Sequence, residues 1–401
     1  MSHRLSARLH GLRSSPIREI LAVASREDVV SFAGGLPARS ALPELDGVSI
    51  ARDDLQYGPS EGEPALRRRI AGDLRRRGLE VDPGQVIVLS GSQQGIDLVA
   101  KLVVDPGTAV AVESPTYLAA LQAFSLFGAE YVPWRIDALG SMLGTSAPAM
   151  LYCIPTFQNP SGHVYSGAQR RELARACDER GTILFEDDPY RDLVYEPCER
   201  TPVASFVRRS EWVYLSSFSK TLAPGLRLGY LVSSPALHAP LLRLKQAADL
   251  HSNRLAQRIV LDLLDDPGAE ARMERVRDAY RLRRDLFERS LRRHFADLAR
   301  WTRPAGGLFF WLEMTSGRPL RLLDALPAAL EAGVAFMPGE PFFAEDVAAS
   351  NRLRLSFGNA PPEAFDRGLA VLADLLRELV RVSPDGAGDR DRIECSGRPP
   401  S

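Results

Sequence analysis

The sequence contains little cysteine, no long apolar run and almost no net charge. Its four cysteines are scattered and include no C-x-x-C pair, so neither a disulfide framework nor a zinc or other metal site is expected; they are Cys153, Cys177, Cys198 and Cys395. The first 22 residues carry charges where a signal peptide needs an apolar core, and no stretch approaches the ~20 apolar residues of a transmembrane helix. These absences predict a soluble, cytoplasmic protein with reduced thiols.

The overall charge excludes two classes of partner. A formal net charge of −1 provides no basic field for nucleic acid or for an anionic membrane, so neither is expected to bind. An apolar content of 45% and a charged content of 25% are typical of a globular protein. Because 401 residues exceed the usual size of one hydrophobic core, two domains are expected.

Lysine is also rare. Only Lys101, Lys220 and Lys245 occur, although lysine and arginine together number 50. Lys101 and Lys245 lie in helix-like runs and are expected on helix surfaces. Lys220 follows a strand-like run at 212–215 and the small polar stretch 216–219. An amine can lose its proton and attack a carbonyl, which guanidinium cannot do, so Lys220 is either a catalytic amine or a solvated loop lysine.

From residue 86 onward, short apolar runs alternate with helix-like segments. Strands are expected at 86–90, 109–114, 129–134, 149–155, 182–190 and 212–217, with helices at 91–104, 115–128 and 168–181. This alternation predicts an α/β fold, with a large domain built on an open, mostly parallel sheet flanked by helices. Such sheets bind their ligands at the carboxyl ends of the strands.

The expected strand ends carry polar groups of complementary chemistry. Ser92 and Gln93 stand at a helix start after the first strand, where they form either an anion-binding site or a helix cap. Tyr117 follows the next strand and is either a ligand-facing or a core aromatic. Asn159 and Asp187 follow two later strands. An acid, an amine, an aromatic ring, an amide and anion donors at successive strand ends are hard to explain as caps and core alone.

The segments on either side predict a second, smaller α+β domain. Helices are expected at 13–24, within 55–79, at 269–296 and at 362–381, and strands near 29, within 306–314, at 334–339 and at 353–358. The arginines of 55–79 are expected to face solvent. The predicted division is 1–45 for an N-terminal arm and part of the small domain, 46–275 for the large domain and 276–382 for the rest of the small domain. The charged, Pro/Gly-rich tail 383–401 is expected to be disordered.

A series of motifs carries a family resemblance. The motifs are SFAGGLP (31–37), GSQQ (91–94), SPTY (114–117), PTFQNPSG (155–162), EDDPY (186–190), SSFSKTLAPGLRLGY (216–230), PAGGLFFWL (304–312) and NRLRLSFGNA (351–360). In order and spacing they resemble fold-type I, pyridoxal-phosphate-dependent aminotransferases of class I/II, from about residue 13 to about residue 375. The closest similarity is to the branch of 2-aminoadipate and kynurenine-type aminotransferases and MocR-type regulators.

The resemblance implies pyridoxal 5'-phosphate as cofactor and assigns its partners. Lys220 would bond covalently to the cofactor aldehyde and move the proton at the substrate α-carbon. Asp187 would lie against the ring nitrogen and keep it protonated, so that the ring can accept electrons. Tyr190 and Asn159 would bond the phenolic oxygen of the ring, and Tyr117 would stack on its face.

The resemblance further implies a phosphate site and a homodimer with shared active sites. The phosphate would be held by Ser92, Gln93, Ser217, Ser219 and Arg227, the last with a fixed fork of donors. Tyr57 would reach the phosphate of the neighbouring subunit. Asp188 receives no role and is expected to be a solvated turn residue.

On the substrate side, the resemblance assigns Arg354 to the α-carboxylate. Arg352 is the competing arginine, but it falls outside the R-L-S-F frame. Gly35 would lie under the substrate backbone, and Asn159 would also contact the substrate. Arg18 would either meet a side-chain carboxylate or be an exposed helix arginine.

The implied activity is ping-pong amino transfer between an L-amino acid and a 2-keto acid, with glutamate and 2-oxoglutarate expected as one pair. The alternative is another reaction of the same apparatus, such as decarboxylation, elimination, racemisation or oxidation in specialised metabolism. A ligand-sensing MocR-type regulator is not favoured, because the match begins within the first ~15 residues and the charge is not basic. The sequence does not specify which amino acid is used.

Overall fold

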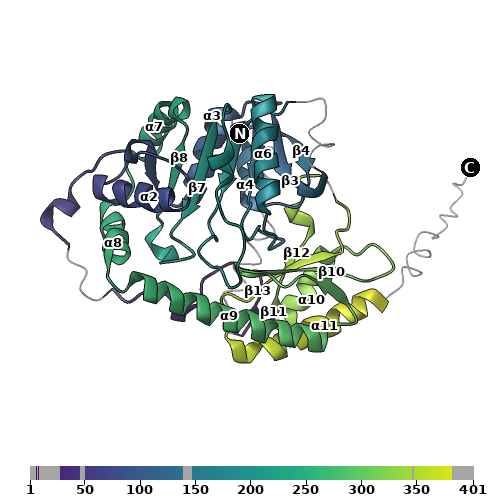
Figure 1. The fold of residues 1–401 in the computed structure, drawn as a ribbon. Coiled ribbons are helices and arrows are strands. Elements are labelled where there is room, and N and C mark those ends of the chain that lie inside the picture. The colour runs from purple at the N-terminus through teal and green to yellow at the C-terminus, as the bar shows by residue number, and fades with distance from the viewer. Residues whose placement is uncertain are drawn as a thin grey trace, which may run out of the picture.

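The computed structural model describes residues 6, 8, 28–45, 50–138, 147–345 and 347–381. In this part of the chain the largest sheet has seven strands in the order β2-β8-β7-β6-β5-β3-β4 (Figure 1). Neighbouring strands are parallel except at β8, which runs antiparallel to β2 and β7. The predicted mostly parallel α/β sheet is confirmed. Its strands are β2 (Val86–Leu89), β3 (Ala109–Glu113), β4 (Glu130–Trp134), β5 (Met150–Cys153), β6 (Ile183–Asp187), β7 (Trp212–Ser217) and β8 (Gly229–Ser233).

Both faces of this sheet are apolar and covered by helices. Successive side chains of a strand point to opposite faces, so β5 places Leu151 in one core and Tyr152 in the other. The first core also contains residues of α2 (Pro64–Arg76), α6 (Gly167–Arg180) and α8 (Arg254–Asp265). The second contains residues of α3 (Ser92–Val103), α4 (Leu118–Leu126) and α7 (Pro235–Asp249). A sheet buried on both faces leaves the strand ends as the place for ligands.

A smaller α+β region lies below the large sheet in Figure 1. Its antiparallel sheet has the order β12-β13-β10-β9. A third hydrophobic core joins this sheet to its helices, and the rings of Phe287, Phe310 and Phe365 meet within it. The elements are α9 (Ala269–His294), β9 (Ala299–Trp301), β10 (Phe309–Met314), α10 (Leu326–Glu331), β12 (Met337–Pro338), β13 (Arg352–Ser356) and α11 (Phe365–Arg381).

The beginning of the described chain belongs to the same region. β1 (Val30–Ser31) pairs in parallel with β11 (Val334–Ala335), and the Phe32 ring packs edge-on against Phe287 with centroids 5.2 Å apart. The division into domains at 45/46 and 275/276 stays a prediction. The second of these boundaries falls inside α9, whose single helix runs along the lower edge of the molecule in Figure 1.

The two lysines expected on helix surfaces differ. Lys101 is partly exposed on α3 and pairs with Asp97, as predicted. The prediction for Lys245 is wrong, because its side chain is fully buried and donates to Asp249. Asp249 also accepts a hydrogen bond from Gln94 of α3. The face of α7 that carries Lys245 therefore packs inward, which the sequence of that helix alone does not reveal.

Two expected elements, the helix at 13–24 and the tail 383–401, lie outside the described residues. Within the described ranges, no helix combines the length and apolarity that crossing a bilayer requires. The same ranges contain no group of three or more histidine, cysteine, aspartate or glutamate side chains suited to a metal ion.

Candidate active site

A cavity of about 130 Å³ opens at the carboxyl ends of the central strands. It gathers side chains that follow β2, β3, β5, β6 and β7, although they are scattered over more than a hundred positions of the chain. Every residue that the sequence assigned to the cofactor, except Tyr57, lines it. The lining residues are Ser92, Gln93, Tyr117, Ile154, Asn159, Asp187, Pro189, Tyr190, Ser217, Ser219, Lys220 and Arg227.

Lys220 supplies the amine of this cavity. It follows β7 in a turn where the Ser219 amide donates to Ser217 Oγ at 3.1 Å. Its Nζ donates to the Gly35 carbonyl at 2.9 Å, which ties the turn to the smaller region. Burial, and then the positive charges of Arg354 and Arg227, lower the pKa of Lys220 to about 8. The lowered pKa makes the amine easier to deprotonate near neutral pH, as a nucleophile that must first lose its proton requires.

Asp187 supplies a carboxylate at the end of β6. Its Oδ2 accepts a hydrogen bond from Tyr152 at 2.7 Å, whereas its Oδ1 is buried without a partner among the described residues. Burial raises the pKa of Asp187 to about 7; the Tyr152 bond opposes this and the nearby Asp188 adds to it. A buried acceptor without a donor fits a ligand that presents an N–H group.

Tyr190 and Asn159 form a polar wall beside this carboxylate. The two side chains interact, and the amide Oδ1 of Asn159 also accepts from Arg354 Nη1 at 2.7 Å. Burial raises the pKa of Tyr190 above its usual range, so the phenol keeps its proton and can donate. The Tyr190 ring meets Phe309 edge-on at 5.6 Å, which fixes the hydroxyl in place.

The opposite end of the cavity collects donors suited to an anion. α3 begins at Ser92 and its N-cap position is Gly91, so Ser92 is a first-turn residue rather than a cap. Backbone N–H groups of a helix start attract phosphate. Arg227 Nη1 lies 3.5 Å from Ser219 Oγ. A Cβ at Gly91, whose φ is +84°, would come within 2.5 Å of Arg227 Nη2, so a side chain there would be strained and would push the guanidinium away.

The two remaining cavity residues assigned to the cofactor lie at the edges. Tyr117 is partly buried at the cap of α4, and burial raises its pKa above the usual range. Gln93 is exposed, and its Nε2 donates to the Ala119 carbonyl at 3.3 Å. Tyr117 therefore borders the cavity as a protonated phenol, and is not only a core residue.

A second cavity of about 290 Å³ adjoins the first and shares Tyr117, Asn159, Tyr190 and Lys220 with it. Its cation is Arg354, which is buried and donates from Nη2 to the Ala33 carbonyl at 2.6 Å. The remaining walls are largely apolar and come from both regions of the molecule. They include Gly34, Gly35, Leu36, Leu118, Ala119, Gln122, Met337 and Phe342.

The guanidinium of Arg354 lies between two aromatic rings. Its central carbon is 4.1 Å from the Phe309 centroid and 5.0 Å from that of Phe342. Its Nε has no hydrogen-bond partner among the described residues, so donors remain for a ligand carboxylate. Arg352, the competing arginine, instead pairs with the exposed Glu313 at 3.2 Å and does not line the cavity.

Gly35 is required by this packing. A Cβ there would approach Phe309 Cζ to 2.8 Å, and its carbonyl accepts from Lys220. Gly35 therefore lines the second cavity together with Lys220 and Arg354, and its place beneath a substrate stays a prediction. Arg18 falls outside the described residues.

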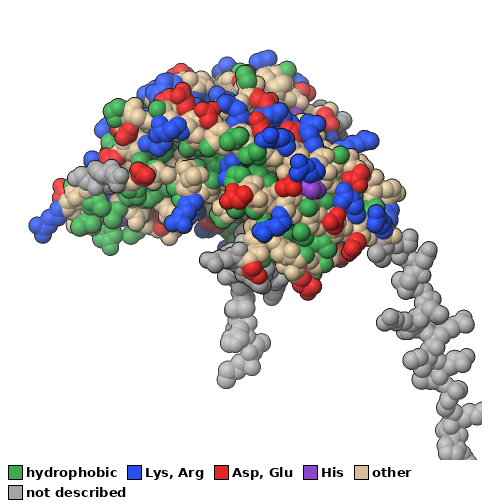
Figure 2. Space-filling model, turned by 90° about the horizontal axis from the view of Figure 1, so that it is seen from below, with side chains coloured by type: hydrophobic (Ala, Val, Ile, Leu, Met, Phe, Trp, Pro, Cys, Tyr) green, Lys and Arg blue, Asp and Glu red, His purple; other side chains and the backbone are tan. Residues whose placement is uncertain are grey.

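Tyr57 does not join this cavity. It is 77% exposed and touches His251 edge-on at 5.6 Å. Its segment is held by Arg254, which donates to the carbonyls of Asp53 and Gln56 at 2.5 and 3.2 Å. Figure 2 shows hydrophobic side chains exposed on the face of the molecule seen from below. Within the same stretch of chain, Ile50 and Leu55 are 52% and 70% exposed.

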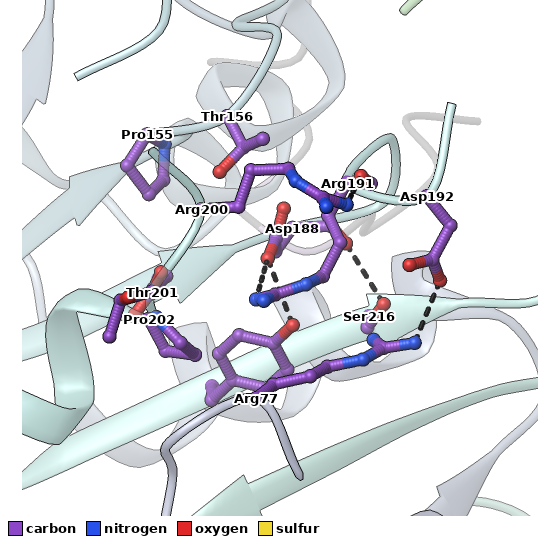
Figure 3. A network of polar contacts seen from close by, with 12 residues as sticks. Arg77, Pro155, Thr156, Asp188, Arg191, Asp192, Arg200, Thr201, Pro202 and Ser216 are labelled. Carbon is purple, nitrogen blue, oxygen red and sulfur yellow. Dashed lines mark hydrogen bonds and ion pairs between the residues drawn. The ribbon is translucent and has the colours of Figure 1, made fainter. Parts of the chain in front are cut away.

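Asp188 differs from its prediction. It was expected to be a solvated turn residue but is 1% exposed, because its backbone continues alongside β7, where its amide donates to the Leu215 carbonyl. Its Oδ2 accepts from Tyr214 at 2.9 Å and from Arg191 Nη1 at 3.2 Å (Figure 3). The sequence reasoning also missed Tyr152, Phe309 and Phe342. The register between strands brings these residues to the site, and no local motif around them indicates it.

The comparisons with known proteins agree with this geometry. The family model "Aminotransferase class I and II" matches residues 32–372. The 2-aminoadipate transaminase of Thermus thermophilus is 38% identical over 389 residues, covering 92% of this chain and 96% of that protein. Aromatic-amino-acid aminotransferase 1 of Thermococcus litoralis is 33% identical, covering 92% and 93%. The structure of T. thermophilus α-aminoadipate aminotransferase complexed with N-(5'-phosphopyridoxyl)-L-leucine superposes with a TM-score of 0.86 at 36% identity, covering 94% and 98%.

Proposed function

Since the chain belongs to the aminotransferase class I and II family and is a pyridoxal-phosphate-dependent aminotransferase of fold type I, we propose that the two adjoining cavities are its active site. One observation carries this proposal. A lysine amine with a lowered pKa, an unpartnered buried carboxylate oxygen and a group of anion donors line one cavity. These are the three partners that an aldehyde, a ring nitrogen and a phosphate require on one planar cofactor.

Each residue of the first cavity would contact a different part of the cofactor. Pyridoxal phosphate supplies an electron sink for the α-carbon of the substrate when it is bound. Asp187 Oδ1 would accept the ring N–H, and Tyr190 and Asn159 would donate to the ring oxygen. Tyr117 would cover one face of the ring. Lys220 Nζ would hold the cofactor covalently and then move the proton at the substrate α-carbon.

The anion end would bind the phosphate group. Ser92, Gln93, Ser217 and Ser219 would contribute donors, and Arg227 would contribute a planar fork. The N-terminus of the 12-residue helix α3 would add its dipole and its free N–H groups. This division of roles is supported by the position of Arg227 beside Gly91, where the backbone carries no side chain to block it.

The second cavity would bind the substrate. Arg354 would grip the α-carboxylate, with each charged hydrogen bond worth roughly 1.5–3 kcal/mol. Gly35 would pass beneath the substrate backbone, and Asn159 would contact both substrate and cofactor. We propose an L-amino acid and a 2-keto acid as substrates, with glutamate and 2-oxoglutarate as one pair. Arg18 would meet a side-chain carboxylate if the amino acid is acidic.

We further propose that two copies form a cytoplasmic homodimer with shared active sites. Tyr57 is far more exposed than an aromatic ring normally is, and Ile50 and Leu55 beside it are exposed as well. A second copy covering this stretch would bury these side chains. Tyr57 would then reach the phosphate in the active site of its partner subunit.

The purified holoenzyme tests the proposal directly. Mixing it with a panel of amino acids should change the visible absorbance of the bound cofactor, and adding 2-oxoglutarate should restore the original spectrum. Lys220→Ala should abolish the covalent attachment and the turnover. Lys101→Ala is the matched control, because Lys101 is an exposed lysine of α3 that pairs with Asp97. An Lys220→Ala enzyme that retained transfer would rule out this site.

A further inference from the structure

Directly behind the cavity lies a buried polar network that the proposed mechanism does not use (Figure 3). Its centre is the ion pair of Asp188 and Arg191, with side chains 0% and 7% exposed and 3.2 Å between Oδ2 and Nη1. Tyr214 of β7 donates to the same carboxylate oxygen at 2.9 Å. Asp188 Oδ1 has no partner in the described part of the chain.

The ion pair is interleaved with the site residues along the chain. Asp187 and Tyr190 belong to the cavity, and Asp188 and Arg191 each come one position later. Because successive side chains of an extended chain alternate, Asp187 faces Tyr152 on one side of the sheet and Asp188 faces Tyr214 on the other. The contacts that hold the Asp188 side chain on one side therefore fix the direction in which the Asp187 side chain points.

The backbone of this turn is fixed by neighbouring elements as well. The Asp188 amide donates to the Leu215 carbonyl at 2.8 Å, and its carbonyl accepts from Ser216 Oγ at 2.9 Å. The Arg191 carbonyl accepts from Arg200 at 2.9 Å. The bonds to Leu215 and Ser216 join the turn to β7, the strand that leads directly to Lys220. The pair thus belongs to the framework that sets the cofactor carboxylate opposite the amine.

The pair also balances charge beside Asp187. Asp188 alone would be a second negative charge next to that carboxylate, and Arg191 compensates it. Other charged or titratable groups surround the pair on every packed element. They are Glu186 and Asp187 of β6, Tyr214 of β7, Tyr230 of β8, Arg277 of α9, Arg77 just after α2, and Asp192, Cys198 and Arg200 in the segment after β6.

We propose that Asp188 and Arg191 are positioning residues whose buried ion pair orients Asp187 and Tyr190 and sets how tightly Asp187 holds a proton. The inference rests on the proposed role of Asp187 as partner of the cofactor ring nitrogen. Neither residue lines the cavity, so both act through their neighbours and through their charge.

The two halves of the pair have opposite electrostatic effects. Without Arg191, the Asp188 anion is uncompensated, so Asp187 holds a proton more tightly and would take a larger share of the proton between it and the ring nitrogen. Without the Asp188 charge, the Arg191 cation has the reverse effect. A more positive ring disfavours a proton on the nearby nitrogen of Lys220. A purely structural role of the pair would not produce effects of opposite sign.

The experiment measures the pH midpoint of the visible absorbance change of the bound cofactor in the holoenzyme. Arg191→Gln should raise this midpoint and Asp188→Asn should lower it, each by about half a pH unit or more. The double variant, which removes both charges, should return close to the parent. Shifts of both single variants in one direction, or no shift in either, would overturn the proposal.

Two controls separate charge from damage. Arg175→Gln and Glu179→Gln break an exposed ion pair of α6 by the same substitutions and should leave the midpoint unchanged. Tyr214→Phe removes one oxygen and one bond to Asp188, so it should raise the midpoint by less than Arg191→Gln does. If Arg191→Gln or Asp188→Asn does not fold, Tyr214→Phe provides the test. An unchanged or lowered midpoint in Tyr214→Phe would contradict the proposal.

Asp187→Asn distinguishes this inference from the proposed function. It should change the spectrum and the midpoint of the bound cofactor. If it changes neither, the role of Asp187 is wrong and the inference fails with it. If it changes them while the variants at 188, 191 and 214 do not, the active site stands and only the positioning role is wrong.

Discussion

Arg354 illustrates at the scale of one residue how burial prepares a charged side chain for a ligand. Burial lowers the pKa of Arg354 to about 10, which still leaves the guanidinium charged at neutral pH. Asn159 and the Ala33 carbonyl accept hydrogen bonds from two of its nitrogens, and the rings of Phe309 and Phe342 pack against the guanidinium. The remaining donors are desolvated, so a carboxylate that reaches them gains two charged hydrogen bonds in a fixed geometry.

Replacing Arg354 by lysine tests this assignment. The charge remains but the planar fork is lost, so one charged hydrogen bond worth about 1.5–3 kcal/mol should disappear. We expect kcat/KM for amino acids to fall roughly 10- to 150-fold, measured by steady-state transfer to 2-oxoglutarate. Arg352→Lys on the same strand is the control and should change kcat/KM little. An equal loss in both variants would show that the choice of arginine is wrong.

At this scale, sequence reasoning depends on whether the residue type itself is informative. Lys220 was identified because lysine is rare in this chain and the motif around it is distinctive. Asp188 was misjudged, because a third acid in an EDDPY turn looks like a surface residue. Its burial depends on Tyr214 and Arg191 reaching it from another strand and from the following turn. The sequence alone does not indicate that these side chains come within hydrogen-bonding distance of Asp188.

At the scale of elements, the start of α3 unites backbone conformation with anion binding. Gly91 adopts φ +84° and lets the chain turn from β2 into the helix, whose first residue Ser92 faces the cavity. With ψ at 159° as well, this conformation is almost confined to glycine, and a residue with a Cβ is strained there by roughly 1–3 kcal/mol. The same missing side chain gives the Arg227 guanidinium its place. The glycine therefore serves the turn and the proposed phosphate site together.

Gly91→Ala should weaken cofactor binding. The added methyl group would displace the Arg227 guanidinium, so we expect the dissociation constant for pyridoxal phosphate to rise about tenfold or more. Titration of apoprotein with the cofactor, followed by absorbance, measures this. Gly84→Ala is the control, because no described atom lies within 4 Å of a Cβ there. Equal affinities in the two variants would argue against a phosphate at this helix start.

The elements themselves were largely predictable. Apolar runs bounded by helices identified β2, β3, β5, β6 and β7, and each strand end then carried the expected site residue. β8 was not predicted as a strand. Its sequence also does not indicate that it would insert between β2 and β7 and run antiparallel to both. Strand order and register are decided by packing between distant segments. Tyr152 and Tyr214 donate to Asp187 and Asp188 only because of that register, so the sequence alone does not reveal these hydrogen bonds.

At the scale of the whole molecule, the exposed stretch around Tyr57 is the feature that a single copy leaves unexplained. Ile50, Leu55 and Tyr57 are 52%, 70% and 77% exposed, and Leu250 is 58% exposed. Arg254 bonds to the backbone of this stretch, so the apolar side chains are presented on a fixed loop. Exposed apolar side chains on a fixed loop are typical of protein interfaces, and a second copy with the same surface would cover them in the dimer that we propose.

Leu55→Asp should therefore break the proposed dimer. A carboxylate in an apolar interface loses its hydration without gaining a partner, so association should weaken and the variant should sediment as a monomer. Activity should fall with it, because Tyr57 could no longer reach the neighbouring phosphate. Leu282→Asp on α9 changes a leucine that is 59% exposed, and it should leave both the mass and the activity unchanged. A fully active Leu55→Asp monomer would mean that each active site is complete in one chain, and Tyr57 would then have no part in holding the cofactor.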